Sequence, residues 1–494
     1  MKTYMKNLFL LAALMAGLGL MLAGRVTAQT LTNLHSFTAT ADPPYTNSDG
    51  SKPSGGLVLS GNTLYGTASA GGIAANGTLF KVNADGSGFT NLHTFTTSRT
   101  NASGTFTNSD GATPSGGLIL SGNSLSLYGT AKFGGTNGNG TVFVVSTNGM
   151  GFTNLHTFTA GHPNLSGFLT NTDGATPYAG LILSGNTLYG TTYAGGSENG
   201  GTVFAVNTDG TGFTNLHTFT GIGSDGFNPR AGLIRSGGTL FGTTANGGSL
   251  VRGMVFAVNT DGTDFTNLHS FAGPAGDGSN PYGGLILFSN TLYGTTWGGG
   301  SLGSGILFAI NTDGTGFTNM YNFIGGTGNK GLRPFAGLIL SGNTLYGTAN
   351  GGGAFGGGSL FTVNTNGTSF TGLYSFTSPS GPIATNLDGA NSQAGLILSG
   401  NTLYGTAYAG GIGGNGTVFS LTLPAPPLLA IIRSEANVIL TWPTNAAGFT
   451  LQSTTNLVPP GNWITNSSLP VVANGQNAVT NPATGAQQFY RLSQ

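Results

Sequence analysis

The chain of 494 residues carries 14 lysines and arginines against 14 aspartates and glutamates, a formal net charge of zero, and no cysteine. This composition excludes disulfides and thiolate metal sites. It also lacks the clustered basic residues that nucleic acid binding requires, so we expect no nucleic acid partner. The 90 glycines fall between runs of β-branched and aromatic residues, which indicates turns rather than disorder.

The first 28 residues are typical of an export signal. Lys2 and Lys6 precede an apolar run from residue 8 to 24, and small residues stand just before Gln29. We therefore expect residues 1–28 to be a cleaved signal peptide and the protein to be secreted or to lie at the cell surface. An uncleaved membrane anchor is the alternative. With Lys2, Lys6 and Arg25 removed, the mature chain would carry 11 basic and 14 acidic residues, a net charge of −3, and we expect it to contain no membrane span.

Two short phrases each recur seven times between residues 31 and 423. The first is GGLVLSGNTLYGT in its earliest copy, and its copies begin at Gly55, Gly116, Ala179, Ala231, Gly283, Ala336 and Ala394. The second is FTNLHTF or a close variant, and its copies end at Phe37, Phe95, Phe158, Phe219, Phe271, Phe323 and Phe376. A period of about 50–60 residues is typical of a β-propeller or a solenoid.

One full unit, residues 179–219, predicts four antiparallel strands. Its first apolar run is typical of a strand buried on both faces, and the later runs are rich in β-branched and aromatic residues. Asp209-Gly210 indicates a hairpin turn. Four such strands joined by tight turns form one propeller blade. We expect the strands at residues 180–183, 187–193, 202–207 and 213–219.

The ends of the repeat region predict how many blades there are. The region begins with a lone fourth strand, residues 31–37, and ends with a lone first-to-third set, residues 395–423. Six complete sets lie between them. We therefore predict an all-β fold in which residues 29–423 form a seven-bladed β-propeller, closed by pairing of its two ends, and we expect a monomer. Closure would leave no exposed sheet edge, whereas the alternative, an open solenoid, would need polar caps.

The repeat pattern stops at Pro424. Residues 424–427 are a stiff Pro-rich linker, and residues 428–494 are expected to form a small β-sandwich with strands near 437–442, 449–453 and 488–492. The Leu-Thr-Trp strand and the late Phe-Tyr-Arg-Leu strand resemble those of fibronectin type III or immunoglobulin-like modules.

The unit GLILSGNTLYGTT…GGTVFAVNTDGTGFTNLHTFTG resembles the GloVer tandem repeat of exported bacterial proteins, and the resemblance covers residues 31–423. It implies a surface or secreted protein built from propeller-like repeats, and it implies no assigned activity.

Histidines and aspartates are the residues that suggest chemistry most directly. Five histidines share one position of the fourth strand, and tyrosine stands there in the other two copies; because tyrosine does not usually replace a metal ligand or general base, we interpret the position as packing. Ten of the twelve aspartates precede glycine, which is turn chemistry, although a calcium role for those between blades is the alternative. We expect no catalytic residue, no metal and no cofactor. The histidines are His35, His93, His156, His217 and His269.

Two positions vary while the sequence around them repeats. One position immediately precedes each copy of the first phrase, and the other follows the Gly-Thr-Ala or Gly-Thr-Thr at the end of each copy. We predict that both sets encircle the mouth of a central channel, on the face that carries the longer loops. The candidate ligand-binding residues are Lys132, Tyr178, Tyr193, Arg230, Tyr282, Trp297, Phe335 and Tyr408.

Aromatic rings beside amides and hydroxyls are suited to stacking on sugars. The sequence therefore predicts an exported, non-catalytic binding module whose partner is a polysaccharide or another cell-surface polymer. Three alternatives stay open. The rings could only plug the channel, the protein could be a lyase or hydrolase in which Lys132, Arg230 or Arg333 steers an acidic polymer, or the repeats could be purely structural.

Overall fold

The computed structural model describes residues 29–493, apart from 42, 103, 124, 164–168, 224, 274–276, 325–330, 425–426, 445–448, 458–462, 467, 474 and 484–486. The expected signal peptide, residues 1–28, and half of the expected linker lie outside the described residues. Strands are the regular elements throughout the described chain, so the fold is all-β. Leu31–Thr422 forms one compact unit, and the residues from Leu423 onward belong to another.

In the described part of the repeat unit, the strands form seven antiparallel sheets, each holding one copy of every strand of the repeat. The first strands are β2 (Val58–Ser60), β8 (Ile119–Leu120), β14 (Ile182–Ser184), β19 (Ile234–Ser236), β25 (Ile286–Phe288), β31 (Ile339–Ser341) and β35 (Ile397–Ser399). The second strands are β3 (Thr63–Ala68), β9 (Ser126–Ala131), β15 (Thr187–Thr192), β20 (Thr239–Thr244), β26 (Thr291–Thr295), β32 (Thr344–Gly352) and β36 (Thr402–Ala407).

The third and fourth strands complete each sheet. The third strands are β4 (Thr78–Asn83), β10 (Thr141–Ser146), β16 (Thr202–Asn207), β22 (Met254–Asn259), β28 (Ile306–Asn311), β33 (Gly356–Asn364) and β37 (Thr417–Thr422). The fourth strands are β5 (Thr90–Thr94), β11 (Thr153–Thr157), β17 (Thr214–Thr218), β23 (Thr266–Ser270), β29 (Thr318–Asn322), β34 (Thr371–Thr377) and, in the last sheet, β1 (Thr30–Ser36).

The first strand differs from its prediction. It was expected at 180–183 and buried on both faces, but β14 covers Ile182–Ser184 and is only half-buried. Ala179 and Gly180 line a central pocket instead of pairing in the sheet. The loops also contain short ribbons that the sequence did not indicate: β6 (Arg99–Thr100) with β7 (Phe106–Thr107), β12 (His162–Pro163) with β13 (Leu169–Thr170), β18 (Gly226–Phe227) with β21 (Asn246–Gly247), β24 (Gly278–Ser279) with β27 (Gly298–Gly299), and β30 (Gly331–Pro334) with β32.

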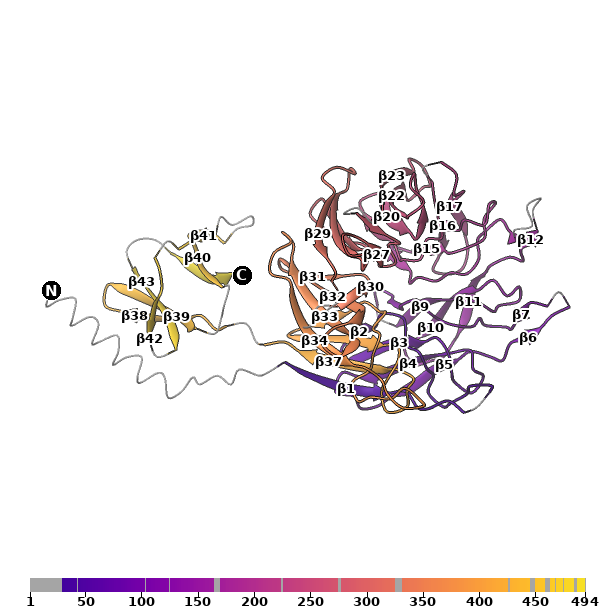
Figure 1. Cartoon of the computed structure of the whole chain (residues 1–494), viewed down its shortest axis with the longest axis horizontal. Coiled ribbons are helices and arrows are strands. Elements are labelled where there is room, and N and C mark those ends of the chain that lie inside the picture. The colour runs from indigo at the N-terminus through magenta and orange to yellow at the C-terminus, as the bar shows by residue number, and fades with distance from the viewer. Residues whose placement is uncertain are drawn as a thin grey trace. The chain divides into compact units, whose positions relative to one another are not determined.

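The two ends of the repeat unit meet in one sheet. Strand β1 lies beside β37, so the sheet order is β1-β37-β36-β35, and Figure 1 shows the indigo strand next to the orange one. The Phe37 N–H continues this pairing by donating to the Gly416 carbonyl at 3.1 Å. Leu34, Phe37 and Val418 are buried together with Leu57 and Phe80 of the sheet that follows. The first strand of the chain therefore completes the last repeat.

A series of backbone contacts places the seven repeats in cyclic order. A Cβ atom on Gly117 would lie 3.0 Å from the Gly56 carbonyl oxygen, and one on Gly180 would lie 2.8 Å from that of Gly117. The series continues through Gly232, Gly284, Gly337 and Gly395, and a Cβ on Gly56 would lie 3.7 Å from the Gly395 carbonyl oxygen. The segments before the first strands thus approach one another, and at Gly117, Gly180, Gly232 and Gly337 the approach is closer than ordinary van der Waals contact with a Cβ would allow. The fold is propeller-like.

Each hydrophobic cluster joins two neighbouring sheets. In one of them, Leu79 and Phe95 from one sheet pack against Leu127, Phe143 and Val145 from the next. The Phe95 and Phe143 rings meet edge to face, with centroids 5.7 Å apart. Burying a phenylalanine contributes about 1.5–3 kcal/mol, so packing between the sheets supplies the main stabilisation of the repeat unit.

The glycine of each Tyr-Gly-Thr or Phe-Gly-Thr run is required by this packing. A Cβ on Gly190 would lie 2.6 Å from Phe204 Cζ and 2.7 Å from Leu181 Cδ2. The tip of the phenylalanine ring of the third strand therefore occupies the space over the second strand that a side chain would fill. The same close approach occurs at Gly66, Gly129, Gly242, Gly294, Gly347 and Gly405.

The histidines of the fourth strands link one sheet to the next. The His93 ring stacks on Phe152 of the following sheet at 3.8 Å between centroids, and its Nε2 lies 2.9 Å from Asp110 Oδ2 in the connection to that sheet. Because a carboxylate only accepts, the ring N–H is the donor. The other four histidines make equivalent pairs with Asp49, Asp173, Asp225 and Asp277.

These contacts change how the aspartates between the sheets are interpreted. Burial alone would raise the pKa of Asp110, but hydrogen bonds from His93 and Thr96 outweigh it and hold the pKa below its ordinary value of 3.8. The turn interpretation is therefore wrong for these aspartates, although it holds for hairpin residues such as Asp209, which accepts from the N–H two residues later. A sixth pair of this kind has tyrosine in place of histidine: on β34, the Tyr374 hydroxyl donates to Asp388 at 2.9 Å.

The residues after the repeats form two further sheets. One has the order β38-β39-β43-β42 and the other β41-β40-β44. Buried Leu440 and Trp442 of the first sheet cluster with Leu451 of the second. The three strands expected here are found within one residue of their predicted starts. The bounds are β38 (Ala430–Ser434), β39 (Asn437–Pro443), β40 (Thr450–Thr454), β41 (Ile464–Thr465), β42 (Val471–Ala473), β43 (Gln476–Pro482) and β44 (Phe489–Ser493).

Candidate functional site

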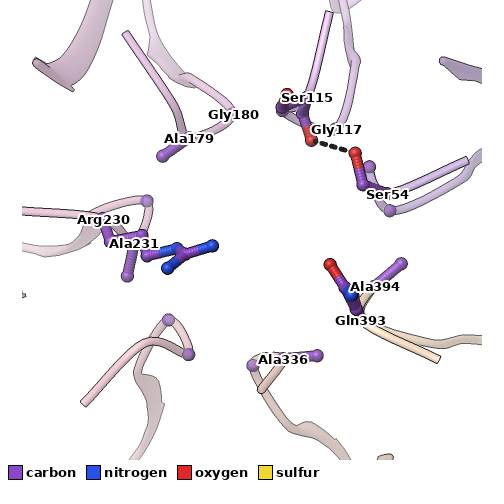
Figure 2. A pocket seen from close by; sticks show the side chains of 18 of the residues that line it. Ser54, Ser115, Gly117, Ala179, Gly180, Arg230, Ala231, Ala336, Gln393 and Ala394 are labelled. Carbon is purple, nitrogen blue, oxygen red and sulfur yellow. Dashed lines mark hydrogen bonds between the residues drawn. The ribbon is translucent and has the colours of Figure 1, made fainter. Parts of the chain in front are cut away.

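A pocket of about 150 Å³ lies where all seven repeats meet. Each repeat contributes three consecutive residues to its lining: one variable residue, one glycine or alanine, and one glycine. Figure 2 shows these segments pointing toward a shared centre, into which the Arg230 side chain extends. The small residues bring the backbones together, so the chemical character of the pocket is set by the variable residue. The variable residues are Ser54, Ser115, Tyr178, Arg230, Tyr282, Phe335 and Gln393.

A left-handed residue positions each of these side chains. Two residues before every variable residue, the backbone adopts a positive φ between 54° and 60°. Its N–H donates to a loop carbonyl of the preceding sheet; that of Thr176, for example, donates to Asn139 at 2.8 Å. The contact recurs in every repeat, and Lys52 of the first repeat donates to Asn415 of the last. The left-handed residues are Lys52, Thr113, Thr176, Asn228, Asn280, Arg333 and Asn391.

The same residue brings the second variable set beside the first. The Thr176 carbonyl accepts from the N–H of Tyr193 at 3.0 Å, and the Asn280 carbonyl accepts from that of Trp297 at 3.0 Å. As a result, Tyr193 lies next to Tyr178, with ring centroids 6.5 Å apart. In the same way Trp297 lies 5.9 Å from Tyr282. The second set therefore lies just outside the pocket lining, against the first set.

Arg230 makes the most extensive contacts in the pocket. Its Cζ lies 4.4 Å from the centroid of Tyr178, and 4.5 Å from the centroids of Tyr282 and Phe335. Its NH2 group also donates to the Tyr178 hydroxyl at 2.7 Å. Each of these three rings comes from a different repeat, and cation–π contacts at such distances are attractive. Arg230 thus ties four repeats together across the pocket.

Lys132 adds a second positive charge. Its Nζ lies 4.8 Å from the centroid of Tyr178 and 4.6 Å from that of Phe133. Burial lowers the pKa of Lys132, and the nearby charge of Arg230 lowers it further. We call Lys132, Tyr178, Arg230, Tyr282 and Phe335 the cation–aromatic cluster.

The cluster occupies one side of the pocket only. On the other side the lining residues are Ser54, Ser115 and Gln393, and the Ser54 hydroxyl donates to the Ser115 carbonyl at 3.4 Å (Figure 2). Tyr408 is half-buried and lies beside Lys52, whose Nζ is 6.0 Å from its ring centroid. Burial raises the pKa of the Tyr408 phenol, and Tyr178 contributes to the same shift.

The structure brings most of the candidate residues together. Tyr178, Arg230, Tyr282 and Phe335 line the pocket as expected, and Lys132, Tyr193 and Trp297 contact them. Tyr408 contacts Lys52 instead. The sequence did not indicate the cluster, because its members come from five repeats and no local pattern connects them. Arg333, whose Cζ lies 4.9 Å from the Trp297 centroid, extends the cluster outward.

Two further observations concern metals and membranes. Among the residues described by the structure, no group of three or more His, Asp or Glu side chains is arranged to hold a metal ion. In the same part of the chain, no helix is long and apolar enough to span a membrane.

Comparison with known families agrees with the repeat pattern. The model of the Gloeobacter/Verrucomicrobia repeat matches three times, at residues 25–170, 163–327 and 274–433, and so covers most of the chain. The chain belongs to the Gloeobacter/Verrucomicrobia repeat family. It is therefore a tandem-repeat protein, as expected from its recurring phrases. No curated protein sequence matches it.

Several solved structures resemble this Gloeobacter/Verrucomicrobia repeat protein distantly. An oligogalacturonate lyase in complex with manganese is 10% identical, with a TM-score of 0.47, 80% of this chain covered and 97% of the other. A gluconolactonase from Xanthomonas campestris is 14% identical, with a TM-score of 0.37 and coverage of 82% and 92%. A nidogen/laminin complex is 14% identical, with a TM-score of 0.32 and coverage of 52% and 76%.

Proposed function

We propose that this protein is an exported seven-bladed β-propeller that binds an extracellular carbohydrate polymer at its central pocket, without catalysing a reaction. Residues 1–28 would be its signal peptide, and residues 428–494 a fibronectin type III-like or immunoglobulin-like sandwich. The seven sheets, their cyclic contacts and the pairing of β1 with β37 support the propeller.

The observation that carries the binding function is the concentration of aromatic rings around the pocket. Tyr178, Tyr193, Tyr282, Trp297 and Phe335 are all half-buried, so each keeps part of its ring exposed. Exposed aromatic faces beside polar groups are suited to stacking on sugar rings. Rings that served only as a plug would be expected to be fully buried, as Phe37, Phe95 and Phe158 are.

The aspartates support binding rather than catalysis. A glycosidase needs two carboxyl groups that flank its substrate. Here Asp49, Asp110 and Asp173 are buried and already accept hydrogen bonds from histidine and from the threonine that follows each fourth strand. Their place between neighbouring sheets gives them a structural role.

Substitution of rim aromatics tests the proposal. We expect Tyr193→Ala and Trp297→Ala to weaken binding of the polymer by about 2 kcal/mol each, roughly thirtyfold, because a stacking surface is lost. A glycan array would identify the polymer, and titration calorimetry would measure affinity. Phe288→Ala is the control, since Phe288 is an exposed aromatic at the end of β25, outside the pocket lining.

The melting temperature separates binding from packing. If Tyr193→Ala and Trp297→Ala lower it strongly while leaving polymer affinity unchanged, the rings serve packing and the proposal fails.

A further inference from the structure

We propose that the polymer is acidic, and that the pocket takes one of its carboxylate or sulfate groups between Lys132 and Arg230. This inference rests on the proposed function and specifies its ligand. It is supported by the charge of the pocket, by the hydrogen-bond donors there and by the pocket's size.

The first support is uncompensated charge. Both cations lie within 5 Å of the centroid of one ring, Tyr178. All ion pairs found among the described residues join a histidine to an aspartate, so no described carboxylate pairs with Lys132 or Arg230. Two partly desolvated like charges repel each other, and an anion between them would remove that repulsion.

The second support is the set of donors on Arg230. The Tyr178 hydroxyl accepts one of its N–H groups, and its buried Nε makes no hydrogen bond within the described structure. A guanidinium carries five N–H donors in a planar fork that matches a carboxylate or a sulfate. The bond to Tyr178 is the one hydrogen bond of Arg230 found within the described structure, so its terminal amino groups keep N–H donors for an anionic ligand.

The third support is size. A pocket of about 150 Å³ corresponds to roughly five water molecules at about 30 Å³ each. That volume accommodates one anionic group but not a sugar chain. The chain itself would lie over the rim, where Tyr193 and Trp297 offer stacking surfaces and Arg333 adds a further charge beside Trp297.

The mature chain as a whole is not attractive to anions, since its 14 acidic residues outnumber its 11 basic ones once the signal peptide is removed. Anion binding would therefore depend on the local cluster rather than on the overall charge. Variants of the cluster should then affect binding far more than equal changes of charge elsewhere.

The test compares three polymers on the mature protein: alginate, which carries carboxylates, dextran sulfate, which carries sulfate esters, and neutral dextran. We expect alginate or dextran sulfate to bind, and Arg230→Gln and Lys132→Met each to weaken that binding at least tenfold. The matched control is Arg235→Gln, which removes one charge at an exposed position of β19, outside the pocket lining, and should leave affinity unchanged. Binding should also weaken as salt is raised.

The outcomes distinguish the inference from the function on which it rests. If dextran binds as tightly as the acidic polymers, and Trp297→Ala weakens binding while Arg230→Gln does not, the pocket binds sugars but the acidic assignment is wrong. If none of the polymers binds, and the glycan array also finds no ligand, both proposals fail. If Arg230→Gln does not fold, the Lys132→Met variant decides. The inference is wrong if Lys132→Met binds alginate or dextran sulfate with the same affinity as the unchanged protein.

Discussion

At the scale of single residues, the seven left-handed positions decide where the pocket side chains lie. Asn228, Asn280 and Asn391 are suited to this conformation, because asparagine tolerates a positive φ. Each also uses its side chain: the Asn228 amide donates to the Tyr193 carbonyl at 2.8 Å, and Asn280 donates to Ala245 at 2.9 Å. Thr113 and Thr176 adopt the same conformation with a β-branched side chain, which is strained.

This comparison predicts that Thr176→Asn stabilises the protein. The change should relieve backbone strain and add an amide donor toward the Lys132 carbonyl, raising the free energy of unfolding by about 1 kcal/mol. Chemical denaturation would measure it. The reverse change, Asn228→Thr, should lower the free energy of unfolding by a similar or larger amount, and an unchanged value for both variants would contradict the strain argument.

The sequence predicted which residues would encircle the pocket but not how they contact one another. The two variable sets stood out because the phrases around them repeat. Arg230 and its three rings come from four different repeats, so no local spacing connects them. The left-handed backbone conformation before each variable residue could not be predicted either, because lysine and arginine, which stand there as Lys52 and Arg333, do not indicate a positive φ.

At the scale of elements, the link between neighbouring sheets consists of a histidine, an aspartate and a phenylalanine. His93 on β5 stacks on Phe152, which directly precedes β11 of the next sheet, while its ring N–H binds Asp110. The sequence predicted the strands well, because their β-branched runs are long and bounded by turns. It did not predict the His–Asp pairs, because Asp-Gly indicates a turn wherever it occurs.

The lowered aspartate pKa values predict acid sensitivity. Because the folded-state pKa of Asp110 lies below its ordinary value of 3.8, its stabilising effect is complete above that value and is lost as the pH falls through the folded-state pKa. The same direction holds for Asp49, Asp173, Asp225 and Asp277. We therefore expect the free energy of unfolding to fall steeply below about pH 4.

The variant Asp110→Asn checks this explanation. It should lower the free energy of unfolding by about 2 kcal/mol at pH 7, because the buried pair with His93 is broken. Between pH 5 and pH 3, the free energy of unfolding of this variant should fall less than that of the unchanged protein. Asp264→Asn, at an exposed position, is the charge-matched control. If Asp110→Asn keeps the full acid-dependent loss, the His–Asp pairs are not its cause.

At the scale of the whole molecule, the contact between the first and last repeats holds the unit together. The count of incomplete repeats predicted that residues 31–37 complete the final sheet, and β1 lies in that place beside β37. The sequence allowed this prediction because its last repeat, residues 395–423, lacks a fourth strand, and a lone fourth strand, residues 31–37, stands before the first repeat.

We expect deletion of residues 30–37 to cause aggregation or a large loss of melting temperature, because it exposes the edge of β37 and removes Leu34 and Phe37 from the core. The milder variant Phe37→Ala should cost about 3–5 kcal/mol. Its matched control is Phe158→Ala, the equivalent change in an internal repeat, where the side chain is also fully buried. If Phe37→Ala costs much less than Phe158→Ala, the closing contact contributes little stability.

The glycine series around the pocket has a consequence for the redesign of the pocket lining. Each repeat lines the pocket with a glycine of this series, and at Gly117, Gly180, Gly232 and Gly337 a Cβ atom would lie closer to the neighbouring backbone than ordinary van der Waals contact. The seven variable residues, two positions before these glycines, do not belong to the described hydrophobic clusters that join neighbouring sheets. Under the proposed function, combinatorial libraries at these seven positions should change which ligand the pocket binds, as variation of hypervariable loops does in an antibody. The positions are Ser54, Ser115, Tyr178, Arg230, Tyr282, Phe335 and Gln393.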